Sequence, residues 1–251
     1  MDLALGAGIS ARHLSFVETG RSQPGRATIL SLLEQLDVPY RERNRVLLAG
    51  GHAPMLPEYP LDHPDLAAVR SAVDVILKSH EPYPAMAVDR VWNIVATNSA
   101  VAALTSAVEV APELLEPPIN AVRASLHPRG LAPLIVDVET WRAFFRTRLE
   151  RQYAWSGDPR LAELLAELDD YGTGRDGRRP PDPLQSSTPG PLKMRGPGGT
   201  ELSFISMFAG FDSPFEVTTS ELAVELLFPA DEATTALLEK APAARAPAEA
   251  G

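Results

Sequence analysis

Helical periodicity of apolar positions dominates the first fifty residues of the chain. One buried stripe is predicted at Ile29, Leu32, Leu33 and Leu36, which recur three and four residues apart. A short helix is predicted from Tyr40 to Ala49, behind Pro39, with Val46 and Leu47 packed inward. The run 50–54 then breaks the pattern, because glycine ends a helix and proline blocks its continuation. The pattern predicts a helical module over residues 1–53.

A mixed pattern begins at residue 54. A helix is predicted to start at Asp62-His63-Pro64, since proline suits a first turn. Its buried stripe is Leu66, Val69, Val73, Ile76 and Leu77. Residues 85–88 and 91–95 have the composition and alternation of two strands. Asn98 follows them and is placed to cap a helix through Leu104, because its amide oxygen can accept a free backbone N–H.

The remaining segments combine helices with strands. Residues 112–155 and 157–168 are predicted mostly helical, and the Gly, Pro and Ser-rich stretch 172–190 is predicted to be a mobile loop. Strands are predicted at 191–195, 201–209 and 221–228, the last with Leu222, Val224, Leu226 and Phe228 on one face. Asp231 is expected to cap a final helix through Lys240, before a disordered tail at 241–251. The chain is therefore predicted to be α+β.

The segment from Leu3 to Gly20 carries the most functional information. Gly8 is expected at a turn, with the small residue Ala4 four positions earlier, where two helices approach closely. Leu14 and Val17 are expected on the inner face of the following helix. A small residue, a turn glycine and two inward aliphatic residues at these offsets are what a helix-turn-helix needs to aim its second helix at the major groove.

The outer face of that second helix and the loop after it supply candidate DNA contacts. These candidates are Ser10, Ala11, Arg12, His13, Ser15, Phe16, Arg21, Ser22 and Arg26. Ser10 is also placed to cap the helix. Arginine can pair with guanine and a phenyl ring can contact a thymine methyl, whereas the loop residues are expected to reach phosphates. Phe16 has an alternative explanation, because an outward phenyl ring also suits packing on an adjoining domain.

Composition narrows the class of protein further. The chain has 251 residues, no cysteine and a net charge of −10, with six basic and five acidic side chains in residues 1–53. The acidity therefore lies downstream, which indicates two modules with different partners and argues against nucleic-acid binding by the whole surface. No apolar run approaches the about 20 residues of a membrane span, and the first residues do not resemble a secretory signal. We expect a cytoplasmic protein that has no disulfide and does not enter a membrane.

Residues 9–24 resemble the helix-turn-helix of Cro/repressor-type (xenobiotic-response-element) proteins, in which the stretch Glu18-Thr19-Gly20-Arg21 is typical. Further motifs are similar, in the same order, to those of MmyB-like transcription regulators. They are 36–39, 41–44, 50–54, 89–98, 125–128, 157–159 and 228–231. The similarity covers about residues 2–240. It implies a ligand-responsive DNA-binding transcription regulator, with double-stranded DNA, a small molecule and a second copy of the chain as partners.

The chain departs from that family at its start. Family members have one more helix, usually ending in a serine–glutamine pair whose glutamine touches phosphate, and Met1 falls where the second helix should begin. Losing its buried side chains would cost several kcal/mol, at roughly 1.5–3 kcal/mol each. The expectation is a DNA-binding domain over residues 1–53 that lacks its first helix. The alternative is a small-molecule sensor or protein-interaction module that has lost DNA binding.

The same resemblance implies a PAS-like domain for ligand binding and dimerisation over residues 54–240. This is an antiparallel sheet surrounded by helices, with a pocket for a small apolar or fatty-acid-like ligand. The candidate ligand contacts are Arg90, Trp92, Asn98, Phe204 and Phe208, with Phe215 as a further cavity candidate. Arg90 would pair with a carboxylate. Core packing of the aromatics, a solvated Asp-Arg turn and capping by Asn98 are the alternatives.

Enzymatic and metal-binding functions find little support in the motifs. The chain has no Gly-x-Ser-x-Gly, no His-Glu-x-x-His, no phosphate loop and no Gly-x-Gly-x-x-Gly. His63 with Asp62 and Asp65 forms a local cluster, but helix capping explains it. We expect no enzyme, no metal and no cofactor other than a bound apolar ligand.

Overall fold

The computed structural model describes residues 2–105, 109–171, 190–196, 199–211 and 215–240. The chain divides into two compact units. The N-terminal unit comprises Met1–Leu61 and Asp212–Ser220, and the sheet unit comprises the rest. The first unit therefore extends past the predicted boundary at residue 53 and takes in a piece of chain from between two later strands. The predicted loop at 172–190, apart from Gly190, and the tail at 241–251 lie outside the described residues.

The N-terminal unit is built from short helices. They are α1 (Asp2–Gly6), α2 (Ala11–Glu18), α3 (Arg26–Gln35), α4 (Tyr40–Ala49) and α10 (Val217–Ser220). The predicted bounds of α4 are confirmed, and Ile29, Leu33 and Leu47 form the buried cluster. The inward placement of Leu36 and Val46 is wrong, since they are 46% and 42% exposed. Leu36 lies past the end of α3, and Val46 is turned by about 100° around the helix axis from buried Leu47.

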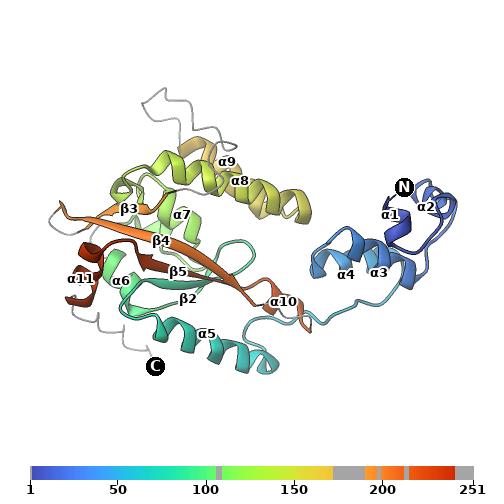
Figure 1. Ribbon diagram of the computed structural model, residues 1–251, viewed down its shortest axis with the longest axis horizontal. Coiled ribbons are helices and arrows are strands. Elements are labelled where there is room, and N and C mark those ends of the chain that lie inside the picture. Colours follow the sequence, from blue (N-terminus) through green and yellow to red (C-terminus); the bar gives the residue numbers. More distant parts are fainter. Residues whose placement is uncertain (1, 106–108, 172–189, 197–198, 212–214, 241–251) are drawn as a thin grey trace. The chain divides into compact units, whose positions relative to one another are not determined.

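The sheet unit contains one five-stranded antiparallel sheet in the order β2-β1-β5-β4-β3 (Figure 1). Its strands are β1 (Ala85–Val88), β2 (Ile94–Thr97), β3 (Leu192–Arg195), β4 (Glu201–Gly210) and β5 (Ala223–Pro229). The predicted α+β class with a helical N-terminus is confirmed. The central strand β5 lies between β1 and β4, although they are far apart in sequence.

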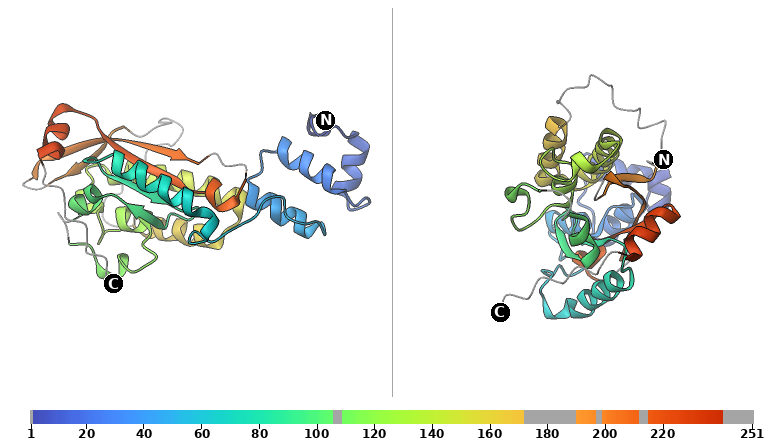
Figure 2. Two further views of the ribbon diagram at one scale, coloured as in Figure 1. Left: turned by 90° about the horizontal axis from the view of Figure 1, so that it is seen from below. Right: turned by 90° about the vertical axis from the view of Figure 1, so that its left-hand side faces the viewer.

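Helices cover both faces of the sheet, as the end-on view in Figure 2 shows for α5 and α8. The helices of this unit are α5 (Ala67–Ser79), α6 (Ser99–Thr105), α7 (Ala121–Leu126), α8 (Val138–Ser156), α9 (Pro159–Tyr171) and α11 (Glu232–Lys240). On one face α5 buries Val73 and Leu77 against β1 and β5. The main core lies on the other face, where α7, α8 and α9 pack against Phe204 of β4. No helix within the described residues is both long enough and apolar enough to span a bilayer.

Burial on both faces changes the side-chain pattern of β5. The predicted alternation put Phe228 on one apolar face with Leu222, Val224 and Leu226, but Phe228 is 37% exposed, whereas Glu225 is only 8% exposed. A central strand covered on both sides buries consecutive residues, so a simple in-and-out alternation does not describe it. The polar residue Glu225 therefore lies inside the unit.

The turn between β1 and β2 is longer than predicted. Asp89 Oδ1 accepts the backbone N–H of Val91 and of Asn93, at 2.9 and 2.8 Å. Trp92 has a φ of +70°, in the left-handed region. These bonds hold residues 89–93 in a compact turn, so the second strand begins at Ile94 and not at Val91. The predicted cap of the last helix is confirmed, because Asp231 Oδ1 accepts the N–H of Thr234 at 2.7 Å.

Candidate functional site

A glycine turn joins α1 to α2 in the N-terminal unit. Gly8 has a φ of +68°, which glycine adopts without strain, and Ala4 is 2% exposed. Ser10 precedes α2, and its hydroxyl accepts the N–H of His13 at 3.1 Å. The predicted turn and helix cap are confirmed.

Helix α2 presents most of its candidate DNA contacts to solvent. Ala11, Arg12 and Ser15 are exposed, and His13 and Phe16 are half-buried. The Arg12 guanidinium lies 5.4 Å from the centre of the Phe16 ring, a cation–π distance. The described N-terminal unit leaves the inward residues Leu14 and Val17 only half-buried, so α2 has no fully buried side chain.

The residues after α2 separate into two groups. Arg21 is exposed and Ser22 is half-buried, directly after Gly20 with a φ of +69°. Arg26 differs from the prediction, because it is the first residue of α3 and not part of a loop. Its guanidinium donates to the backbone carbonyls of Ala53 and Pro54. In this structure Arg26 therefore holds the chain after α4, and a phosphate would have to compete with those carbonyls.

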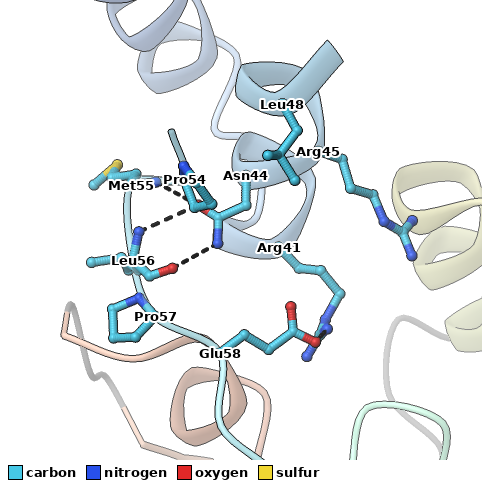
Figure 3. Close-up of a pocket in the computed structure, with 9 residues that line it drawn as sticks. All are labelled: Arg41, Asn44, Arg45, Leu48, Pro54, Met55, Leu56, Pro57 and Glu58. Carbon is cyan, nitrogen blue, oxygen red and sulfur yellow. Dashed lines mark hydrogen bonds and ion pairs between the residues drawn. The ribbon is translucent and has the colours of Figure 1, made fainter. Parts of the chain in front are cut away.

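Asn44 of α4 holds the chain that leaves the helix (Figure 3). Its Oδ1 accepts the N–H of Met55 at 2.7 Å, and its Nδ2 donates to the carbonyl of Leu56 at 2.8 Å. Arg41 and Glu58 form an ion pair beside it. A pocket lies between these residues, but Asn44, Arg41 and Glu58 already bind one another or the backbone. We interpret this pocket as part of the linker's attachment to α4.

Glu216 anchors the later segment within the N-terminal unit. Its side-chain oxygens accept the backbone N–H of Tyr59, Thr218 and Thr219 at 2.9, 2.8 and 2.6 Å. Burial alone would raise the pKa of Glu216, but these hydrogen bonds outweigh it and hold the pKa below its ordinary value. Val217 adds a backbone hydrogen bond to Pro57 at 3.1 Å. The carboxylate thus ties residues 216–219 to the linker.

An apolar cavity lies on the main-core face of the sheet unit. Its walls include Met86 of β1, Leu104 of α6, Trp141 and Phe145 of α8, and Leu227 of β5. Its volume is about 70 Å³, which is room for a few waters or a short alkyl chain. A concave, mostly apolar space with few polar groups is the usual form of a small-molecule site.

None of the five predicted ligand contacts is among the described residues that line this cavity. Phe204 is fully buried in the main core. Trp92 is 2% exposed and its Nε1 donates to Gln152 Oε1 at 2.8 Å. Phe208 packs edge-on against Trp92, with the Arg148 guanidinium 4.0 Å from its ring centre. These aromatics are core residues, which was the alternative that strand spacing left open. Phe215 is 79% exposed and belongs to the N-terminal unit.

Arg90 and Asn98 also have structural partners. Arg90 forms ion pairs with Asp158 at 2.7 Å and with Glu221 at 3.7 Å, so a ligand carboxylate would have to displace an acid. Hydrogen bonds from Arg160, opposed by burial and assisted by the charge of Arg90, hold the pKa of Asp158 well below its ordinary range. This cluster joins the β1–β2 turn to the start of α9.

Asn98 bridges three segments and does not cap α6. Its Oδ1 accepts the N–H of Ala85 at 3.1 Å, and its Nδ2 donates to the carbonyl of Tyr83 at 2.7 Å and of Leu77 at 3.3 Å. Glu81 takes the N–H at the start of α6 instead, from Ser99 at 2.8 Å. Helix α6 begins directly after Asn98, as predicted. The side chain that accepts its first N–H is Glu81 and not Asn98.

Glu225 is the polar residue of the cavity that the sequence prediction missed. It is the one ionisable side chain among the described lining residues, and Ser206 Oγ donates to its Oε1 at 2.7 Å. Burial raises the pKa of Glu225, partly offset by that hydrogen bond and by the charge of Arg148. A single acid within the apolar run 222–228 was the available signal.

No group of three metal-ligating side chains occurs among the residues whose placement is described. His63 instead accepts the N–H of Asp65 at 3.2 Å through Nδ1, which confirms the capping explanation. The candidate site is therefore an apolar cavity with one acid, in a different unit from the α2 surface.

Comparison with known proteins places the sheet unit in a family. Residues 69–241 match the model of the MmyB-like transcription regulator ligand binding domain. Among curated proteins none matches the chain. The matched segment covers more than half of the sequence and contains all the cavity residues named above. The chain therefore belongs to the MmyB-like transcription regulator ligand binding domain family.

Proposed function

We propose that this protein is a ligand-responsive transcription regulator that binds double-stranded DNA through α2 and a small apolar molecule through the cavity of its sheet unit. The family match supports transcription regulation and ligand sensing. Beyond this, we infer that α2 reads DNA and that the bound ligand controls how tightly α2 does so.

The exposed face of α2 supports the DNA-binding part of the proposal. The Gly8 turn sets α2 off from α1, and Arg12 and Ser15 remain exposed on a helix with no buried side chain. Arg12 offers a donor pair for a guanine edge, and exposed Arg21 follows at the helix end for a phosphate. One such helix reads only a few base pairs, so we infer a homodimer on a two-fold site. The homodimer and the cytoplasmic location stay predictions.

The mostly apolar, partly open cavity supports the sensing part. Its walls come from β1, β3, β5, α6, α7 and α8, which pack around the main core. A ligand that fills such a space gains the burial of its apolar surface, about 25 cal/mol per Å². Regulation requires, in addition, that the ligand binds one state of the protein better than another.

A covalent connection links the cavity to the unit that carries the DNA-binding surface. Glu225 and Leu227 of β5 line the cavity, and residues 212–220 immediately before β5 belong to the N-terminal unit. Glu216 fixes that segment to Tyr59, in the linker that follows α4. A change in the cavity that displaces β5 therefore acts on residues that are covalently close to the N-terminal unit.

Selection from a random duplex library tests the DNA-binding part. The full-length protein is incubated with the library at two salt concentrations, and the bound duplexes are sequenced. We expect enrichment of a two-fold symmetric sequence, with an affinity that falls as salt rises because counterions are released. Binding that enriches no sequence at either salt concentration would refute DNA reading by α2.

A further inference from the structure

Glu225 is the one ionisable side chain among the described residues that line the mostly apolar cavity. It lies in the central strand β5, opposite Met86 of β1 and Phe208 of β4, and is 8% exposed. Thr105 and Ser125 also line the space, but neither can carry a charge. No basic side chain occurs among the described lining residues. The chemistry of a ligand's polar group is therefore set mainly by this carboxyl.

The carboxyl of Glu225 has one oxygen without a partner. Oε1 accepts the hydroxyl of Ser206, whereas Oε2 has no hydrogen bond and no ion pair within the described residues. All fully enclosed side-chain oxygens and nitrogens in that part of the chain do have partners. Oε2 is therefore not sealed. Because Glu225 lines the cavity, we infer that Oε2 is open to the cavity.

The neighbouring cation, Arg148, does not act as the missing partner of Glu225 Oε2. Arg148 of α8 is near enough to influence Glu225 by its charge, but it forms no ion pair with it. Its guanidinium is stacked on the rings of Phe208 and Trp92, at 4.0 and 4.8 Å from their centres. A buried carboxyl that lacks a full charge partner is costly, and a cation inside the cavity would supply one.

We propose that the cavity selects a small apolar amine, whose protonated nitrogen donates a hydrogen bond to Glu225 Oε2 while its alkyl or aromatic part fills the space between β1, α6 and α8. The proposal rests on the proposed ligand-sensing function and specifies the ligand class. A fatty acid fits less well, because two facing carboxyl groups in an apolar space cannot both ionise, whereas an ammonium group stabilises the ionised form of Glu225.

Three probes of equal chain length test this selectivity: hexylamine, 1-hexanol and hexanoate. Their binding to the full-length protein is measured by isothermal titration calorimetry at pH 7, where an alkyl amine is protonated. We expect hexylamine to bind about tenfold or more tightly than 1-hexanol, because its hydrogen bond to the acid is charge-assisted, and hexanoate to bind most weakly.

Two variants locate the effect. Glu225→Gln keeps the shape of the side chain, and we expect the affinity for hexylamine to fall to that for 1-hexanol while 1-hexanol itself is unaffected. Glu201→Gln, which changes an exposed acid of β4 outside the cavity, should keep the preference for the amine. Circular dichroism confirms that both variants are folded.

The outcomes separate the ligand class from the broader function. Binding of 1-hexanol with no preference for hexylamine, or tighter binding of hexanoate, would overturn the amine proposal and leave ligand sensing intact. A preference for hexylamine that survives in Glu225→Gln would overturn the role of the acid. If none of the three probes binds, the cavity does not accept ligands and the sensing part of the proposed function falls with it.

Discussion

The N-terminal unit and the sheet unit differ in how much apolar surface they enclose. The described cluster of the N-terminal unit has three buried side chains, Ile29, Leu33 and Leu47, whereas the main core of the sheet unit joins α7, α8 and α9 to the strands. The difference follows from their proposed tasks. A helix that reads DNA must keep one face free, and a site for an apolar ligand must be surrounded. The unit that responds to the ligand is therefore the better packed of the two.

Leu47→Ala should have the largest effect and should separate the units. Leu47 is fully buried at the centre of a small cluster, so its truncation is expected to cost about 2–5 kcal/mol. Hydrogen exchange should then show loss of protection in α3 and α4, with β4 and β5 still protected.

The matched control for Leu47→Ala is the neighbouring residue. Leu48 is 58% exposed, so Leu48→Ala should change the stability by less than about 0.5 kcal/mol. If Leu47→Ala removes protection from the sheet as strongly as from α3 and α4, the two units do not have separate stabilities and the comparison fails.

Asp158→Asn should weaken the sheet unit by about 1.5–3 kcal/mol at pH 7, the usual worth of hydrogen bonds to a charged group. The buried carboxylate pairs with Arg90 at 2.7 Å and Arg160 at 2.8 Å. Because the pKa of Asp158 is lowered on folding, its stabilisation is present above the unfolded-state pKa, about 3.9, and is lost as the pH falls through the folded-state value.

Urea titrations of wild type and Asp158→Asn at pH 7 and pH 3 measure this difference. The gap between the two proteins should be full at pH 7 and smaller at pH 3. A gap that stays constant over this range would show that the ion pairs do not account for the effect of the substitution.

Substitutions in the DNA-reading region should have smaller and more selective effects. Arg12→Ala is expected to cost about 1–3 kcal/mol on the preferred sequence and to relax selectivity at one base pair. Arg21→Ala should weaken binding equally on all sequences and reduce the salt slope by about one. Fluorescence anisotropy with the selected duplex and a scrambled duplex distinguishes these patterns, and equal weakening on both by Arg12→Ala would make Arg12 a phosphate contact.

Local rules predicted the N-terminal unit well and the cavity poorly. The turn at Gly8, the cap at Ser10 and helix 40–49 each depend on neighbouring residues, so their signals survive in the sequence. The position of Glu225 depends on which strands flank β5 and on the helices over both faces. That information is tertiary, and residue alternation along one strand does not contain it.

The predicted ligand contacts lie outside the lining of this cavity for a related reason. Arg90 and Asn98 were chosen as polar residues near a hairpin, but each is held by partners distant in sequence, Asp158 for the first and Leu77 for the second. Aromatic residues such as Phe204 marked the core and not the cavity. A cavity is formed where side chains leave space, and periodicity identifies only the side chains that are present.

Coupling between the two units is tested by the affinity for DNA when the cavity is occupied. The Kd of the selected duplex is measured by anisotropy with no probe and with saturating amounts of whichever six-carbon probe binds the cavity. We expect the Kd to change about fivefold or more, and the affinity for the probe to change by the same factor when DNA is bound. An unchanged Kd for DNA on protein shown by calorimetry to be saturated with probe would contradict it.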